Sequence, residues 1–275
     1  MLCVEYRMRT DEQVLQAVQY HHNNVVENYK RRETEVLMTV LIGSQNYNIA
    51  SDSSDIDTVS FVLPNITEIA SLRDPVATEY ELDDGKCIVK DIRAALNLLM
   101  KTNPNSVEWF CSNYNIYNSN YEHMLKKFFD KKHRSEFLYC DLFQMENSCR
   151  GMAKQLKNRN MPAGKKYSHA LRIRDMFVSY ILGDTDNILK FRNEETRLIA
   201  AEAKRCNDES RNEEFQQKSE EVADEISKMI EELNNTLSND NKLAIQQNKN
   251  KATIGHLQSS LTVKHFLLQT AEIFR

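Results

Sequence analysis

The chain has 275 residues, with 36 basic and 40 acidic side chains and a formal net charge of −4. Its six glycines and four prolines are few for this length, which excludes collagen-like and proline-rich chains and disfavours a sandwich or barrel with many tight turns. The near-neutral charge argues against a protein that wraps nucleic acid over its whole surface.

The first elements predicted along the chain are a helix and a buried strand. Apolar residues recur at helical spacing over residues 11–29, behind Asp11, which can cap a helix. The run EVLMTVLI over residues 35–42 is nearly continuous, apolar and β-branched, which is typical of a buried strand.

Two further strands are predicted in the first half. A small polar stretch over residues 43–54 leads into the pattern DIDTVSFVL of residues 55–63, which ends at Pro64. A short strand over residues 87–90 follows a turn signal at residues 83–85.

Helical patterns dominate from Ile92 onwards. The predicted helices cover residues 92–100, 121–129, 137–156, 166–182 and 197–237. We therefore expect an α+β protein, with a mixed sheet-and-helix half over residues 1–118 and a helical half over residues 119–275.

The end of the chain is acidic and rich in asparagine. Within residues 213–240 an apolar stripe at helical spacing predicts a helix packed on its own domain, and the alternative is a short coiled coil with a partner. Residues 234–251 are the best candidate for a mobile surface loop.

Chemistry concentrates between Gly43 and Pro64. A backbone without a side chain at Gly43, followed by Ser44, lets amide hydrogens approach a phosphate. Asp55 and Asp57 are spaced i, i+2 at the start of a strand, so both carboxylates face one side. They repel each other unless a cation lies between them, and oxygen ligands select a hard ion such as Mg²⁺. This pattern is typical of metal-assisted nucleotidyl transfer, and its alternative is a polar turn with surface acids.

The same segment resembles the signature of the DNA polymerase β-like nucleotidyltransferase superfamily, in which Gly-Ser is followed by Asp-x-Asp on the next strand. More narrowly, it is similar to the predicted nucleotidyltransferases of phages and bacteria that are named for an RNA repair pathway. The matching residues are Gly43, Ser44, Tyr47, Ser54, Asp55, Asp57 and Pro64. Asn48 stands where that pattern prefers glycine, and asparagine tolerates a left-handed backbone better than most residues.

Two later segments extend the resemblance to roughly residues 36–183. Residues 91–108 resemble the family's Asp-Leu-Arg helix with its Asn-Pro and Glu, and residues 165–182 resemble its helix with Lys, His and Arg. The resemblance implies a small mixed sheet with a helical C-terminal domain over the active-site cleft. It also implies that Tyr47 and Ser54 bind the nucleotide together with Gly43 and Ser44. It further implies that Lys166, His169 and Arg172 contact nucleotide phosphates, where the residues alone suggest a solvated basic face.

The chain departs from the family at the third carboxylate, which relatives carry on a later strand to complete a two-metal site. Lys86 or Val89 occupies that place here. Asp91 is the first candidate to replace it as a catalytic metal ligand, and a helix N-cap is an equal alternative for that residue. Asp83 and Asp84 are also close in sequence.

The resulting hypothesis is an enzyme that uses Mg²⁺ or Mn²⁺ to transfer an NMP from an NTP to a hydroxyl of an RNA end, a protein or a small molecule. The alternative is a catalytically degenerate module that binds nucleotide or regulates a partner. A third hypothesis is an RNA-repair scaffold that docks RNA on the basic run of residues 126–134. The adjacent His21 and His22 diverge on a helix and are not expected to bind metal.

The cysteines and the apolar runs of the sequence indicate in which cellular compartment we expect the protein. Its six cysteines are scattered, which fits a reducing environment. No apolar run approaches the roughly 18 residues that span a bilayer, and the N-terminal residues lack a secretory pattern. We expect a cytoplasmic protein of a bacterial or phage-infected cell, without membrane contact.

Overall fold

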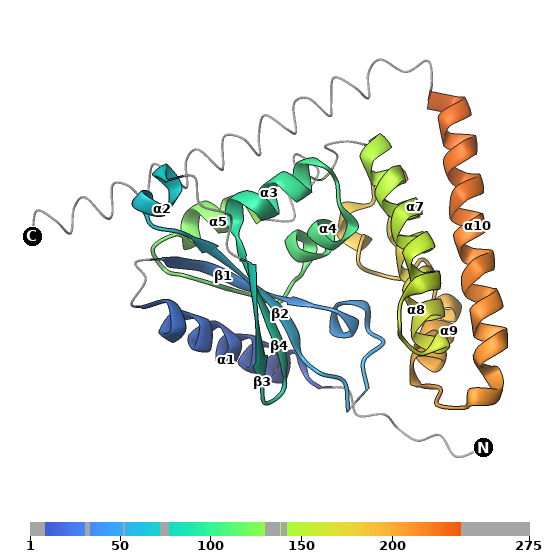
Figure 1. Cartoon of the computed structure of the whole chain (residues 1–275), viewed down its shortest axis with the longest axis horizontal. Coiled ribbons are helices and arrows are strands. Elements are labelled where there is room, and N and C mark those ends of the chain that lie inside the picture. Colours follow the sequence, from blue (N-terminus) through green and yellow to red (C-terminus); the bar gives the residue numbers. More distant parts are fainter. Residues whose placement is uncertain are drawn as a thin grey trace, which may run out of the picture.

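A computed structural model describes residues 9–30, 34–51, 53–71, 77–129, 138 and 142–237. The protein has the expected α+β architecture, with a five-stranded mixed sheet in the order β3-β4-β2-β1-β5 (Figure 1). The strands are β1 (Glu35–Ile42), β2 (Asp57–Leu63), β3 (Ala77–Leu82), β4 (Gly85–Asp91) and β5 (Asn115–Tyr117).

The pairing of the strands determines which side chains meet at the end of the sheet. Strand β1 is antiparallel to β2 and β5, β2 is parallel to β4, and β3 is antiparallel to β4. Because Thr58 pairs with Cys87, the preceding residues Asp57 and Lys86 are also neighbours. Lys86 in turn pairs with Glu81.

Helices cover both faces of the sheet and form a bundle beside it. Their bounds are α1 (Asp11–Tyr29), α2 (Ile66–Ala70), α3 (Ile92–Met100), α4 (Pro104–Cys111), α5 (Glu122–Phe129), α7 (Leu142–Asn158), α8 (Ala163–Ile181), α9 (Glu194–Arg205) and α10 (Asn212–Leu237). In Figure 1, α1 covers one face of the sheet, α3 and α4 cover the other, and α7 to α10 stack next to the sheet. Among the described residues, no helix is long and apolar enough to cross a membrane.

The hydrophobic core is divided by the sheet. On the α1 side, Val14 and Val18 pack against Leu41 and Ile56. On the other side, a larger cluster begins at Phe61 of β2 and continues without interruption into α4, α7, α8 and α10. Strand β2 and the helical bundle are therefore packed against one continuous core, which fixes their relative position.

Several predicted elements need correction. Residues 197–237 do not form one helix, because the chain leaves α9 after Arg205 and re-enters a helix only at Asn212. Helices α2 and α4 and strands β3 and β5 were not predicted. The last residues of the expected surface loop, 238–251, lie outside the described residues, and 234–237 belong to α10. The division into two domains stays a prediction; its boundary falls between β5 and α5.

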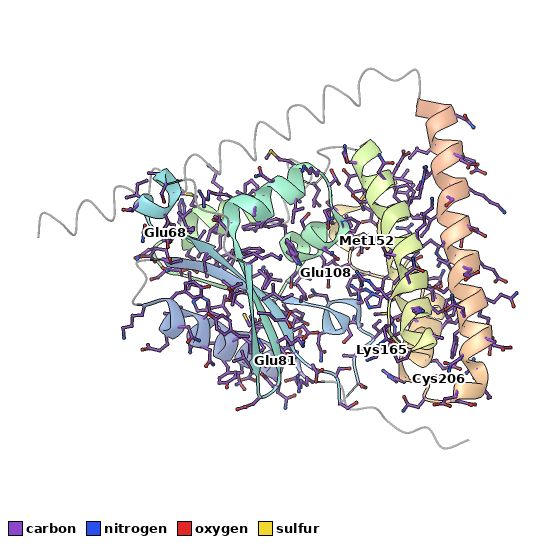
Figure 2. All side chains as sticks on the ribbon, in the orientation of Figure 1. Glu68, Glu81, Glu108, Met152, Lys165 and Cys206 are labelled. Atoms are coloured by element: carbon purple, nitrogen blue, oxygen red, sulfur yellow. The ribbon has the colours of Figure 1, made fainter. Side chains whose placement is uncertain are left out.

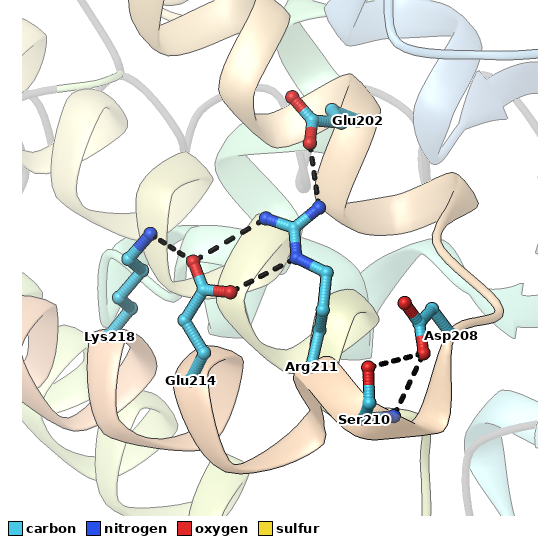
Figure 3. Close-up of polar contacts among 6 residues, drawn as sticks. All are labelled: Glu202, Asp208, Ser210, Arg211, Glu214 and Lys218. Carbon is cyan, nitrogen blue, oxygen red and sulfur yellow. Dashed lines mark hydrogen bonds and ion pairs between the residues drawn. The ribbon is translucent and has the colours of Figure 1, made fainter.

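The break between α9 and α10 is held by polar side chains (Figure 3). Asp208 accepts hydrogen bonds from the backbone N–H and hydroxyl of Ser210, at 2.9 and 2.6 Å. Arg211 donates to Glu202 of α9 at 2.8 Å and to Glu214 of α10 at 3.0 Å. Short polar side chains that bind the backbone compete with helical hydrogen bonds, which is why the apolar periodicity did not reveal the break.

Candidate active site

A pocket of about 630 Å³ lies between the start of β2 and the helices α8 and α9. Its lining comes from two separate stretches of the chain, one before β2 and one in the helical bundle. The lining residues are Gly43, Ser44, Ile49, Ser51, Ser53, Ser54, Asp55, Asp57, Met161, Lys165, Ser168, His169, Arg172, Lys204, Arg205 and Asn207. Carboxylates thus lie on the sheet side and cations on the helical side.

The turn at Gly43 has the backbone that the sequence predicts. Gly43 adopts φ 84° and ψ −153°, a region essentially restricted to glycine, and opens a short 3₁₀ helix at Ser44–Tyr47. Asn48 closes that helix in the left-handed conformation, at φ 53°, as expected for a residue that replaces glycine. A methyl group at Gly43 would lie an ordinary 3.7 Å from Oδ2 of Asp57, so glycine is required by backbone conformation and not by space.

Asp55 and Asp57 both line the pocket. Asp57 is the first residue of β2 and is half-buried, whereas Asp55 is exposed in the extended segment before the strand. Burial raises the pKa of Asp57, and the charge of Asp55 raises it further, against a backbone hydrogen bond from Lys86 that lowers it. The pair is therefore electrostatically strained without a cation.

Glu108 of α4 connects the two sides of the pocket, a role that the sequence did not reveal. The backbone N–H of Gly43 donates to its Oε1 at 2.6 Å, and Nη2 of Arg172 donates to its Oε2 at 3.0 Å. The guanidinium of Arg172 also lies 3.7 Å from the ring centre of the buried Tyr47. Figure 2 shows Glu108 between the sheet and the helical bundle.

This network corrects two expectations about phosphate contacts. The amide of Gly43 is occupied by Glu108, so only Ser44 of the predicted pair is left to meet a phosphate directly. Tyr47 does not line the pocket and instead supports Arg172 from beneath.

Helix α8 brings Lys165, His169 and Arg172 to the pocket (Figure 2 labels Lys165). The predicted Lys166 is not among the lining residues, because its neighbour Lys165 takes that face of the helix. Burial and then the charge of Arg172 lower the pKa of His169 to about 3, so its imidazole is uncharged at neutral pH. His169 has no hydrogen-bond partner in the described part of the chain and is available to a ligand.

Helix α9 contributes two cations that the sequence analysis missed. Nζ of Lys204 donates to Oγ of the buried Ser54 at 3.1 Å, and Nη2 of Arg205 donates to the carbonyl of Ala50 at 2.8 Å. Burial, together with Lys165, Arg172 and other cations, lowers the pKa of Lys204 to about 8. These residues hold the loop before Asp55 against the bundle.

The match to a known family agrees with this arrangement. Residues 15–257 match the model of the RNA repair pathway DNA polymerase beta family. The chain belongs to this family. A comparison with curated proteins finds no significant match. The pocket, including both aspartates and the cations of α8 and α9, lies wholly within the matched residues.

In this member of the RNA repair pathway DNA polymerase beta family, Asp91 takes the second of its two predicted roles, that of a helix N-cap. It lies beside Val62, at the opposite end of β2 from Asp57, and is fully buried. Its carboxylate caps α3 through the N–H of Arg93 at 2.8 Å and forms an ion pair with the Arg93 side chain. The structure therefore does not bring Asp91 to the pocket. Asp91 is the N-cap of α3, the alternative role that the sequence offered.

Other acids do not replace Asp91. The carboxylate of Asp84 contacts Nε2 of the buried His21 at 2.7 Å, and neither it nor Asp83 lines the pocket. Among the described residues of this family member, no three His, Cys, Asp or Glu side chains are grouped closely enough to hold a metal ion. Of the residues that the structure describes, Asp55 and Asp57 are the ones that bring carboxylates to the pocket.

The structure also describes the adjacent histidines and part of the basic run that the sequence analysis considered. His21 and His22 are buried, and their Nδ1 atoms contact the hydroxyls of Thr58 and Thr39 at 2.8 and 3.0 Å. In the basic run, Lys126 and Lys127 are exposed on α5, while residues 131–134 lie outside the described residues. RNA contact by this run stays a prediction.

Proposed function

We propose that the protein transfers an NMP from an NTP to an acceptor hydroxyl, assisted by a divalent cation such as Mg²⁺ or Mn²⁺. The observation that carries this proposal is a pocket with Asp55 and Asp57 on one wall and Lys165, Arg172 and Lys204 on the other. A triphosphate needs cations along its length and tolerates carboxylates only where a metal ion bridges them.

The donor set suits such an ion. Magnesium is usually held by one or two carboxylates together with substrate phosphates and water, and two carboxylates line this pocket. The raised pKa of Asp57 indicates a carboxylate that gains from a nearby positive charge. Bound between Asp55 and Asp57, the ion would polarise the α-phosphate of the substrate.

In this proposal the side chains of α8 and α9 bind the phosphates of the NTP. Lys165, Arg172 and Lys204 neutralise the β- and γ-phosphates, and Ser44 donates its hydroxyl to the same groups. His169 is uncharged and has no hydrogen-bond partner among the described residues, so it can donate a hydrogen bond to the nucleotide or accept one from it. Glu108 keeps Arg172 aimed at the phosphates.

In the reaction, the oxygen of the acceptor hydroxyl forms a bond to the α-phosphorus, and its proton passes to solvent water. The bond between the α-phosphorus and the α,β-bridging oxygen breaks, and pyrophosphate leaves against the cations of the helical wall. The family description favours a hydroxyl at an RNA end as the acceptor; a protein or small-molecule hydroxyl is the alternative.

A transfer assay tests the proposal. The protein is incubated with α-³²P-labelled NTPs, Mg²⁺ and RNA or protein acceptors, and label transfer is compared with that of Asp57→Asn. Because a metal ion supplies several kcal/mol of charge stabilisation, we expect Asp57→Asn to lose about 100-fold or more of the activity. Asp224→Asn, an exposed change on α10, serves as the matched control. Equal transfer and equal NTP binding by wild type and Asp57→Asn would contradict the proposal.

A second candidate function is nucleotide binding without turnover, in a sensor or regulatory module. The observation that favours it is Lys86, which lies beside Asp57 and is one of the two positions, with Val89, where the family resemblance implies an acid. Calorimetry separates the two functions. Tight binding of a metal–NTP complex, with no transfer to any acceptor, would favour the binding module.

A further inference from the structure

We propose that the end of the hairpin that joins β3 to β4 positions the two aspartates of the pocket for a metal ion. This hairpin end spans residues 83–86, and its positioning residues are Asp84 and, on helix α1, His21. Neither of the two lines the pocket, so both act through other residues. The inference deepens the proposed function and rests on it.

The hairpin end contacts the backbone between Asp55 and Asp57. The N–H of the intervening residue, Ile56, donates to the carbonyl of Asp84 at 2.8 Å. Gly85 lies so close to Ile56 that a Cβ built on this glycine would be 2.0 Å from the carbonyl oxygen of Ile56. The side chain of Ile56 is fully buried under α1. The hairpin end thus meets the backbone on both sides of the Cα of Ile56.

The hairpin end also binds Asp57 itself. The backbone N–H of Lys86 donates to the carboxylate of Asp57. A carboxylate offers about four acceptor sites, so one such bond orients it and leaves sites for a metal ion. Carboxylates that bind metal ions are usually oriented by hydrogen bonds of this kind.

His21 ties the hairpin end to strand β2. Its ring is fully buried beneath α1, which covers this face of the sheet (Figure 1). Nε2 lies 2.7 Å from Oδ1 of Asp84, and Nδ1 lies 2.8 Å from the hydroxyl of Thr58, the residue after Asp57. Because a carboxylate accepts hydrogen bonds, Nε2 carries the proton and donates to Asp84. One side chain therefore links the hairpin end to the strand that begins at Asp57.

A role in metal binding is distinguishable from a role in stability alone. The aspartates and the cations lie on opposite walls of the pocket. Under the proposed function, the cations of α8 and α9 bind an NTP with or without a metal ion, whereas the aspartates contribute only when the ion is present. Displaced aspartates should therefore weaken binding of the metal complex and leave binding of the metal-free nucleotide unchanged.

Asp84→Ala removes the acceptor of His21 at a position where 30% of the side chain is exposed. Calorimetry measures the Kd of a non-hydrolysable α,β-methylene NTP, once as its Mn²⁺ complex and once in EDTA without metal. For the Mn²⁺ complex we expect the Kd to rise about 10- to 100-fold, as when the partners of metal ligands are lost. In EDTA the Kd should not change.

Two further variants of the hairpin end are matched to this one. Asp84→Asn keeps an oxygen that accepts from Nε2, so it should retain nearly the wild-type Kd for the Mn²⁺ complex. Asp83→Ala changes the neighbouring, exposed carboxylate and should behave like the wild type.

A pair of His21 variants tests the same contact from α1. The amide nitrogen of glutamine reaches the place of Nε2, whereas that of asparagine reaches only the place of Nδ1. His21→Gln should therefore keep the contact with Asp84 and the affinity for the Mn²⁺ complex, and His21→Asn should lose both. Circular dichroism and urea unfolding verify that each variant is folded; if Asp84→Ala is not, the His21 pair decides.

The outcomes separate this inference from the function beneath it. A folded Asp84→Ala that binds the Mn²⁺ complex like the wild type would overturn the inference and leave nucleotidyl transfer standing. Equal losses with and without metal would show a role in stability alone and overturn it too. A loss in Asp84→Asn as large as in Asp84→Ala would show that the charge matters and not the contact with His21. If the wild type binds the analogue no better with Mn²⁺ than without, the proposed function fails, and the inference with it.

Discussion

At the scale of single residues, Glu108 joins the two walls of the pocket through one carboxylate. Each oxygen of its carboxylate accepts from a different wall, one from the Gly43 amide and the other from Arg172. With only 9% of its side chain exposed, Glu108 forms a largely buried ion pair, whose disruption leaves an uncompensated charge.

Replacing Glu108 by glutamine keeps the shape of the side chain. Either the Gly43 amide or Arg172 then faces an NH₂ group, which donates, where it now meets an accepting oxygen. We expect Glu108→Gln to lower the free energy of unfolding by about 3 kcal/mol and to weaken NTP binding roughly tenfold, because Arg172 loses its orientation. Denaturant unfolding and calorimetry measure the two effects. Glu146→Gln, which changes a buried acid of α7 outside the pocket, should reduce stability without changing affinity. Unchanged affinity in folded Glu108→Gln would show that Glu108 has a structural role only.

Lys204 gives nucleotide binding a pH dependence. Its pKa of about 8 in the free protein means that it is cationic at pH 7 and mostly neutral at pH 9.5. Phosphates bind the cationic form, so affinity is full below pH 8 and falls as the pH rises through that value. We expect the Kd for NTP to rise about tenfold between pH 7 and 9.5.

The arginine variant is the control for this pH effect. Lys204→Arg stays charged across the range, so its Kd should be nearly independent of pH. Calorimetric titrations at a series of pH values compare the two proteins. A wild-type Kd that does not change between pH 7 and 9.5 would show that Lys204 does not contact the phosphates.

At the scale of elements, the close contact between α8 and α9 places the cations of both helices at one site. A Cβ built on Gly164 would lie only 2.0 Å from the carbonyl oxygen of Ala203, the residue before Lys204. The absence of a side chain at Gly164 thus sets how closely the last turn of α9 approaches α8, and with it the position of Lys204 and Arg205.

Gly164→Ala should therefore push α9 away from the pocket. We expect a loss of about 1–3 kcal/mol in the free energy of unfolding, together with weaker NTP binding. Thermal unfolding and calorimetry provide the measurements. Gly151→Ala in α7 is the matched control, because its Cβ would meet no atom within 4 Å and alanine favours a helix. Equal behaviour of the two variants would contradict this role of Gly164.

The helices and strands also show where sequence patterns are sufficient to predict secondary structure and where they are not. Helix α1 and strands β1 and β2 were predicted nearly at their bounds. Helix α1 repeats its apolar residues at helical spacing, and both strands are buried runs rich in apolar and β-branched residues. Strand β3 was missed because it lies at the sheet edge and four of its six residues are exposed, including Glu79 and Glu81. An exposed edge strand has no apolar face to give a signal.

Spacing alone predicted the part of the candidate site whose residues are close in sequence, and the family resemblance added His169 and Arg172 of α8. Gly43, Ser44, Asp55 and Asp57 share one short segment and were found from their spacing. Lys204 is in the last turn of a helix, where a cation is common for reasons of helix stability alone. Its presence in the pocket depends on tertiary packing, which a single sequence does not show.

At the scale of the whole molecule, one hydrophobic cluster extends from β2 through α4 into the helical bundle. The pocket lies at the border of the same two regions. A nucleotide that contacts both walls would therefore add a second connection between the sheet and the helical bundle, which already share a core. Because both walls form the pocket only in the folded protein, we expect the nucleotide to bind the folded state alone.

Nucleotide binding should consequently stabilise the whole protein in a single transition. At an NTP concentration of about 100 times Kd, binding adds about 2.7 kcal/mol to the free energy of unfolding. For a chain of this size this corresponds to a rise of roughly 5–10 °C in Tm. Differential scanning calorimetry with Mg²⁺ and NTP measures it, and the parent nucleoside, which lacks the phosphates, should give no rise. A shift confined to one of two separate transitions would show that the walls unfold independently.

The separation of the two walls along the chain has a consequence for biosynthesis. Asp55 and Asp57 are translated long before α9, whose last turn supplies Lys204 and Arg205. A nascent chain that has completed the sheet therefore displays its carboxylates without the cations that would retain a triphosphate. Under the proposed function, we therefore expect substrate capture only after α9 has been synthesised, and we expect products terminated before α9 to carry half of the pocket and not to retain nucleotide.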